Sequence, residues 1–158
     1  ITLSVIVFAF LRTQVPKEQS ECPDKVSIII KDYICDNTRN VINITFQNKG
    51  NFLVDGIFIK FSNSTEGGNI SFLEPIPSSS NNQITRDEWD IGFFYFGKNV
   101  KPLPLSPNRE YMQAFNYTKI SGGLVKRIQI QPFIGDEETE VAIICSDATI
   151  TQEIYDCT

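Results

Sequence analysis

The sequence contains no histidine, and this absence excludes more functions than any other feature of the composition. Histidine is the commonest general base, the commonest zinc ligand and the usual partner of a nucleophilic serine or cysteine. Cysteine pairs with two-residue spacing are also missing, so neither a zinc knuckle nor a dithiol redox motif is present. We therefore expect no catalytic residues, no metal site and no cofactor.

Basic residues are few and scattered: Lys and Arg number 14 against 19 Asp and Glu, which gives a net charge of −5. No basic stripe or cluster occurs, and binding to nucleic acid usually needs one. Apolar residues make up 41% of the chain, enough for a core. The length of 158 residues fits one domain, with or without an appendage.

Long helical patterns are absent after residue 20, and a period close to two takes their place. Strands are predicted in residues 26–34, 40–48, 53–62, 91–96, 110–117, 124–134, 141–145 and 148–155. Lys49-Gly50-Asn51 separates the second run from the third, which predicts a hairpin. The inward positions are predicted to be Ile42, Ile44, Phe46, Ile57, Ile59, Phe61, Leu124, Ile128 and Ile130. Short strands with Gly, Pro and Asn between them indicate a mainly β fold, an antiparallel Ig-like sandwich.

One long apolar run, residues 1–11 (ITLSVIVFAFL), stands ahead of this pattern and carries no charge. A polar hinge, residues 12–20, follows, and Pro16 ends any helix near Val15. The run is predicted to be an α-helix, but its β-branched residues equally favour a strand. We assign residues 1–20 to assembly and residues 21–158 to an extracellular β-sandwich domain. The apolar positions are Ile1, Leu3, Val5, Ile6, Val7, Phe8, Phe10 and Leu11.

This apolar run needs cover from lipid, from its own domain or from another copy of the chain. Eleven helical residues span about 16 Å, and a bilayer core needs roughly 30 Å. No basic stretch precedes the run, so an intact secretory signal is not expected, although the run could be the C-terminal half of a longer helix. The hinge separates the run from its own domain, so a second copy is the expected partner, with a membrane only before assembly.

The four cysteines lie on either side of the first and last predicted strands. We expect two disulfides that tie the ends of the domain together, in preference to four free thiols. Antiparallel strands would pair Cys22 with Cys157 and Cys35 with Cys145. Parallel strands would pair Cys22 with Cys145 and Cys35 with Cys157, and this second arrangement is the one we favour.

Four Asn-X-Ser/Thr sequons occur, at Asn43, Asn63, Asn69 and Asn116. Asn43 falls on the polar face of a predicted strand, while Asn63 and Asn69 fall in a predicted loop. Sugars attached there would project into solvent. Together with the cysteines, the sequons predict an extracellular location.

Two acidic clusters and an aromatic run remain. The clusters surround Trp89 (Asp87, Glu88 and Asp90) and a predicted turn (Asp136, Glu137, Glu138 and Glu140). They could form a calcium site or a carboxylate pair, but solvated loops are the better interpretation because no EF-hand spacing is present. Residues 91–96 (IGFFYF) could join Trp89 in a sugar-binding platform, although core packing is expected for most of them.

This arrangement resembles the archaeal type IV pilin and archaellin-like surface proteins. The stretches that carry the likeness are VINITFQNKGNFLVDGIFIKF, GGLVKRIQIQPFIG and AIICSDATITQEIYDC. The resemblance implies a filament subunit whose apolar segments bundle in the filament core. It also implies glycosylated sandwiches that face outward and contact cell surfaces or other filaments in adhesion.

Three other functions remain open. Residues 1–11 could be a donor strand that completes the sheet of the next subunit. They could instead be part of the anchor of a membrane-bound binding module with a loop ligand surface. A secreted glycosidase is the least favoured, because nothing in the sequence places two carboxylates at the required separation.

Overall fold

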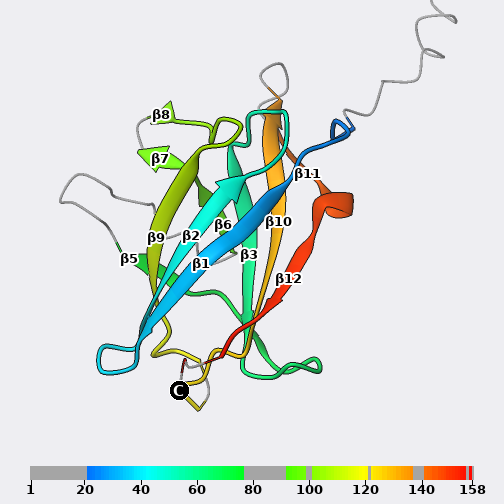
Figure 1. Cartoon of the computed structure of the whole chain (residues 1–158). Coiled ribbons are helices and arrows are strands. Elements are labelled where there is room, and N and C mark those ends of the chain that lie inside the picture. The colour runs from blue at the N-terminus through cyan, green and yellow to red at the C-terminus, as the bar shows by residue number, and fades with distance from the viewer. Residues whose placement is uncertain are drawn as a thin grey trace, which may run out of the picture.

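The computed structural model describes residues 21–76, 92–98, 101–120, 122–136, 141–155 and Cys157. These residues form two antiparallel sheets packed face to face (Figure 1). The predicted helix or donor strand in residues 1–11 and the predicted domain boundary at residue 20 lie outside the described residues. Within the described part, no helix is long and apolar enough to cross a bilayer.

The first sheet has four strands in the order β1-β2-β9-β5. Their bounds are β1 Ile28–Asp36, β2 Val41–Asn48, β9 Glu110–Asn116 and β5 Glu74–Ile76. The second sheet has six strands, with β10 and β3 at its centre. Its strands are β3 Gly56–Ser62, β4 Ile70–Ser71, β6 Phe93–Tyr95, β10 Arg127–Asp136, β11 Val141–Ile144 and β12 Ile150–Glu153.

A separate two-stranded ribbon, β7 (Gly97–Lys98) and β8 (Lys101–Pro102), and one 3₁₀ turn, η1 (Ser146–Ala148), complete the described elements. The ribbon lies in a proline-rich stretch that contains Pro102, Pro104 and Pro107. Proline lacks an N–H for a sheet ladder, so such a stretch suits only short or peripheral strands.

The core between the sheets follows the predicted alternation. Ile42, Ile44 and Phe46 of β2 are fully buried, and so are Ile57 and Phe61 of β3. Aromatic contacts join the two layers, and the rings of Phe61 and Phe115 have centroids 5.3 Å apart. The mainly β fold with two antiparallel sheets is therefore confirmed.

One inward position was predicted wrongly in the last third of the chain. Leu124 is only half-buried, and Val125 is the neighbour that enters the core. The reason is that β10 begins at Arg127, so the residues before it do not continue its alternation. Ile128 and Ile130 are fully buried, as predicted.

The predicted hairpin between the second and third runs is wrong. β2 pairs with β1 and β9, whereas β3 lies in the other sheet and pairs with β10, β4 and β6. The residues after β2 do not turn back. The N–H groups of Lys49 and Gly50 bond to the Ser27 carbonyl, and Asn51 N–H bonds to the Lys25 carbonyl. The chain then crosses to the second sheet.

Asn48 holds this crossing in place. Its side chain is fully buried, and its Nδ2 donates to the carbonyls of Phe52 and Leu105 at 2.8 and 2.7 Å. Its Oδ1 accepts from Gly50 N–H at 2.9 Å. Every strong hydrogen-bonding group of the buried amide therefore finds a partner, as a buried polar side chain requires.

Candidate functional site

The structure joins Cys22 to Cys145 and Cys35 to Cys157, with Cα separations of 5.3 and 5.2 Å. This is the pairing that parallel first and last strands require. β1 and β12 run side by side in the same direction but belong to different sheets (Figure 1). The two bridges therefore close one open side of the sandwich and tie its two layers together covalently. Two disulfides indicate that the domain folds in an oxidising compartment.

Cys22 is also the point at which residues 1–20 join the described domain. A polar groove of about 510 Å³ lies beside the Cys22–Cys145 bridge. It is lined by the charged side chains of Glu21, Asp24, Lys25 and Asp147, among others. Across the described residues, no group of three or more His, Cys, Asp or Glu side chains could hold a metal ion.

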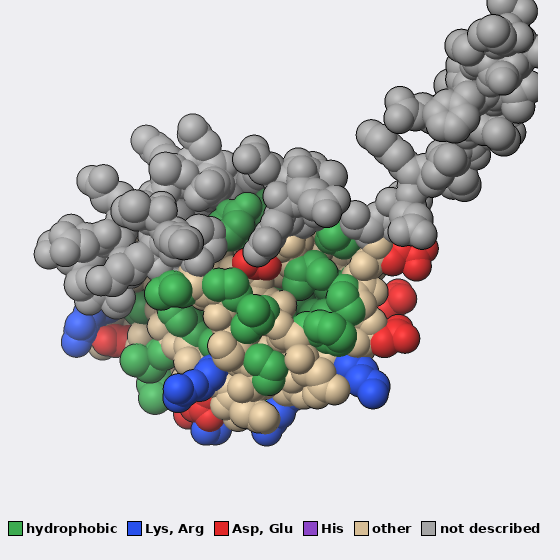
Figure 2. Space-filling model, turned by 90° about the horizontal axis from the view of Figure 1, so that it is seen from above, with side chains coloured by type: hydrophobic (Ala, Val, Ile, Leu, Met, Phe, Trp, Pro, Cys, Tyr) green, Lys and Arg blue, Asp and Glu red, His purple; other side chains and the backbone are tan. Residues whose placement is uncertain are grey.

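The end of the sandwich near Cys22 carries exposed apolar side chains (Figure 2). We call the residues Phe52, Leu53, Leu103 and Ile144 the apolar end. Their exposed fractions are 43%, 54%, 64% and 39%. The first three belong to the connections around the Val54–Leu105 bridge, and Ile144 adjoins the disulfide. Exposed apolar side chains gathered at one end of a domain form a candidate contact surface.

The aromatic run at residues 92–96 divides between two environments. Phe94 and Phe96 enter the core, as expected for most of this run. Phe93 and Tyr95 lie on the outer side of the second sheet, where they contact Phe133 at centroid distances of 5.4 and 4.9 Å.

Phe58 and Phe72 extend this outer cluster, with Phe58 5.1 Å from Phe93 and 5.8 Å from Phe72. The rings are tilted against one another, and Phe133 is fully buried. The described rings therefore form a tilted cluster around Phe133 and not a flat platform for stacking sugars, and the other four rings are half-buried. No period-two pattern in the sequence indicates this cluster, because its members come from four separate segments.

The outer face of the first sheet holds two of the four sequons. Asn43 lies on β2, and Asn116 lies at the end of β9, both half-buried. Asn116 Oδ1 accepts from Thr118 N–H at 2.9 Å. Asn69 is exposed and Asn63 half-buried in the connection between β3 and β4. The four asparagines are thus available at the surface, but on different parts of the domain.

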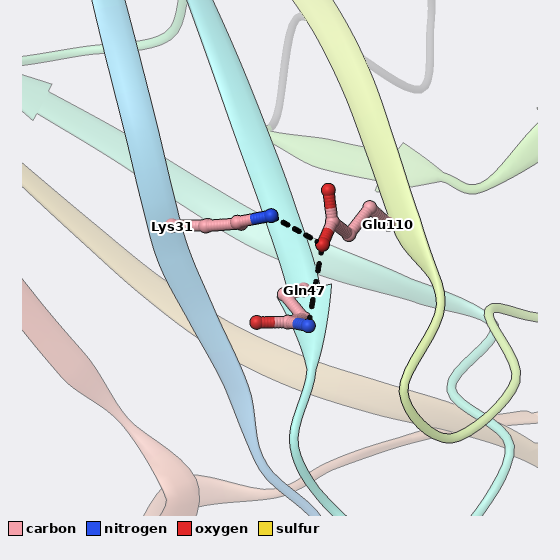
Figure 3. Close-up of polar contacts among 3 residues, drawn as sticks. All are labelled: Lys31, Gln47 and Glu110. Atoms are coloured by element: carbon pink, nitrogen blue, oxygen red, sulfur yellow. Dashed lines mark hydrogen bonds and ion pairs between the residues drawn. The ribbon is translucent and has the colours of Figure 1, made fainter.

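A polar network closes one end of this outer face (Figure 3). Lys31 Nζ lies 2.6 Å from Glu110 Oε1, and Gln47 Nε2 donates to the same oxygen at 3.3 Å. The network crosses β1, β2 and β9 and remains accessible to solvent. Exposed ion pairs of this kind contribute little to stability, about 0–1 kcal/mol.

Comparison with protein-family models, with curated proteins and with solved structures finds no match. The predicted acidic cluster around Trp89 lies outside the described residues, as do Glu137, Glu138 and Glu140. The hairpin that they were predicted to cap is present, because β10 pairs with β11 from Phe133 to Asp136.

Proposed function

We propose that this chain is the structural subunit of an extracellular filament of the type IV pilin kind, polymerising through residues 1–11. The observation that carries the proposal is the Cys22–Cys145 bridge at the point where this apolar segment joins the domain. A subunit held in a filament by one terminal segment must pass pulling force from that segment into its folded domain. A covalent bond at the attachment point does this without unfolding β1.

Cys145 continues this path into the second sheet. It follows β11, and its N–H bonds to the Pro132 carbonyl of the central strand β10 at 2.8 Å. Cys35 and Cys157 join the other ends of the same two stretches. Force applied at Cys22 is therefore shared by both sheets.

The apolar end supports an assembly role. It lies at the end of the sandwich where residues 1–20 attach, so a bundle of apolar segments would sit next to it. Burial of exposed apolar side chains stabilises such a contact by about 25 cal/mol for each Å² removed from water. In this arrangement the opposite end of the domain and the sequon-bearing outer face of the first sheet point away from the filament core, where glycans and adhesive contacts belong.

A substitution inside the apolar segment tests this proposal. Val7→Asp places a charge at the centre of the run, and we expect filaments to disappear from electron micrographs of the full chain. Gln14→Asp adds the same charge in the polar hinge and should leave filaments intact. Filaments of normal number and length from Val7→Asp would overturn the proposal.

A donor-strand filament is the second candidate, and one observation favours it. β9 pairs with β2 along Glu110–Asn116, but β5 covers its other edge only at residues 114–116. Among the described residues, no strand pairs with the first half of β9 on that side. Such an edge can accept a strand from another chain.

Hydrogen exchange separates the two filament types. A donor strand would protect backbone amides in the first half of β9 when the protein polymerises, and a helical bundle would leave their exchange unchanged. A membrane-anchored binding module, the third candidate, would give no filaments and would partition with vesicles through residues 1–11.

A further inference from the structure

The centre of the outer face of the first sheet is uncharged. Its middle row, read across the strands, contains Ile34, Asn43, Ala114 and Ile76 in direct register. The rows on either side contribute Val41, Asn116, Thr45 and Met112. We call these eight residues the neutral face.

Two side chains of the neutral face are unusually exposed for their type. Ile34 is 64% exposed and Met112 is 68% exposed. Among the described residues, charged groups stand at its borders. Asp36 and Glu74 lie in the outermost row on one side, Asp32 lies opposite Thr45 at the β1 edge, and Lys31 and Glu110 lie on the other side. An apolar surface with a charged rim is typical of a surface that something covers.

Asn43 occupies the middle of this face. It lies opposite Ile34 of β1 on one side and Ala114 of β9 on the other. Met112 is its diagonal neighbour, because it lies opposite Thr45, and diagonal positions are about 7–8 Å apart. Thr45, the hydroxyl residue of the sequon, points to the same side of β2 as Asn43.

Asn43 differs from Asn116, the other sequon on this face. Asn116 Oδ1 is held by Thr118 N–H, whereas the Asn43 amide has no hydrogen-bond partner among the described residues. The half-buried Asn43 amide can therefore bond to solvent or to an attached sugar.

We propose that Asn43 carries a glycan whose first sugars lie over Ile34 and Met112. The C–H faces of pyranose rings would cover the apolar side chains, and the sugar hydroxyls would face solvent and the free Asn43 oxygen. This inference rests on the extracellular location in the proposed function, and it does not depend on polymerisation. The glycan is the cover of the neutral face, in place of a protein partner.

The modification is a glycosyl transfer with a lipid-phosphate-linked sugar as the donor. A bond forms between Asn43 Nδ2 and C1 of the first sugar, and the bond between C1 and the donor phosphate oxygen breaks. The phosphate leaves as an anion with the bonding electron pair. Nδ2 loses one proton to a base of the glycosyltransferase.

Glycopeptide mass spectrometry of the full chain from its native source tests occupancy, with the expected result that Asn43 is modified. The covering role is tested with Thr45→Val, which removes the sequon but keeps Asn43, and with Asn43→Gln. We expect both variants to bind several-fold more of an apolar fluorescent dye than the wild type. Asn69→Gln, which removes a sequon in an exposed loop, is the matched control and should bind dye like the wild type.

A third variant, Asn43→Gln with Ile34→Thr and Met112→Thr, should return dye binding to the wild-type level. An unmodified Asn43 would overturn the proposal, and so would dye binding by Asn43→Gln no greater than by Asn69→Gln. Filament formation is scored separately on the same samples. If Asn43 carries a glycan but the chain forms no filaments, the proposed function is contradicted and the glycan proposal is not.

Discussion

Asn48 Nδ2 donates a hydrogen bond of 2.7 Å to the carbonyl oxygen of Leu105, 57 residues later in the chain. This bond and its partner to Phe52 fix the corner at which the chain leaves the first sheet for the second. The corner also presents Phe52 and Leu53 at the apolar end. The same buried amide therefore determines both the topology and the position of the surface expected to face the filament core.

Asn48→Ala should destabilise the domain by about 2–4 kcal/mol, because it removes the three hydrogen bonds of a buried amide, two to the Phe52 and Leu105 carbonyls and one from Gly50 N–H. Urea unfolding followed by fluorescence measures this free energy. Asn51→Ala, at an exposed position in the same connection, should change it by less than about 0.5 kcal/mol. Equal effects of the two substitutions would show that Asn48 does not hold the corner.

At this corner the sequence predicts which side chains are buried but not which strands pair. The alternation within β2 and within β3 predicted their buried positions correctly, because the side chains of a single strand are enough to show which of its faces is apolar. It could not identify their partners. Lys49-Gly50-Asn51 has the composition of a hairpin turn, and only the distant carbonyls of Leu105 and Ser27 show that the chain continues past it. Pairing between strands is a property of contacts far apart in sequence.

The surface features were predictable to different degrees. The sequons and the cysteines are visible as motifs, so Asn43 and the bridged residues could be named from sequence. The neutral face could not, because Ile34 and Met112 become neighbours of Asn43 only through the pairing of β1, β2 and β9. The outer aromatic cluster around Phe133 was missed for the same reason.

The two disulfides should contribute to stability in a non-additive way. Either bridge alone closes a loop of more than a hundred residues, worth about 5 kcal/mol in the chain-entropy model. Once one is formed, the other closes only a ring made of residues 22–35 and 145–157, worth about 3.5 kcal/mol.

Replacing Cys35 and Cys157 by Ser should therefore cost about 3.5 kcal/mol, and replacing all four cysteines should cost about 8 kcal/mol. Chemical denaturation of the single-bridge and bridge-free variants provides the comparison. If removing both bridges costs no more than removing one, the two stretches are not held together by the bonds, and the force path proposed from Cys22 fails.

Gly92 allows the outer aromatic cluster to form. Its φ is +88°, and a Cβ at this position would lie 2.5 Å from Phe72 Cδ1 and 3.0 Å from Phe58 Cε2. Gly92→Ala should therefore combine backbone strain with overpacking and destabilise the domain by about 3 kcal/mol.

Gly67→Ala is the matched control, because Gly67 also has a positive φ, +77°, but has open space around its Cα. Gly67→Ala should lower the free energy of unfolding only by the backbone strain, about 1 kcal/mol. Differential scanning calorimetry of both variants gives the comparison. A melting temperature that falls equally in both would mean that the ring contacts at Gly92 impose no constraint.

Tyr117 should make the domain less stable at alkaline pH. Its hydroxyl lies 2.9 Å from Asn37 Oδ1, and burial, with the negative charge of Asp36, raises its pKa above the ordinary value of 10.0. The unfolded chain then loses this proton at a lower pH than the folded domain. The stabilisation is complete below pH 10 and is lost as the pH rises through the folded pKa.

In Tyr117→Phe, the free energy of unfolding should decrease less steeply above pH 10 than in the wild type. At neutral pH it should be lower than that of the wild type by about 1 kcal/mol, because the hydrogen bond is lost. Urea titrations at a series of pH values between neutral and strongly alkaline measure both effects. An unchanged alkaline slope in Tyr117→Phe would assign the pH dependence to another group.

The central claim, that residues 1–11 hold subunits together, is tested most directly by sedimentation of the full chain and of a variant lacking residues 1–14. Circular dichroism of the truncated variant should show an intact β domain, because all the described core residues and all four cysteines remain. The predicted result is a large polymer for the full chain and a monomer for the truncated chain. A truncated chain that sediments as the same polymer would contradict assembly through the apolar segment.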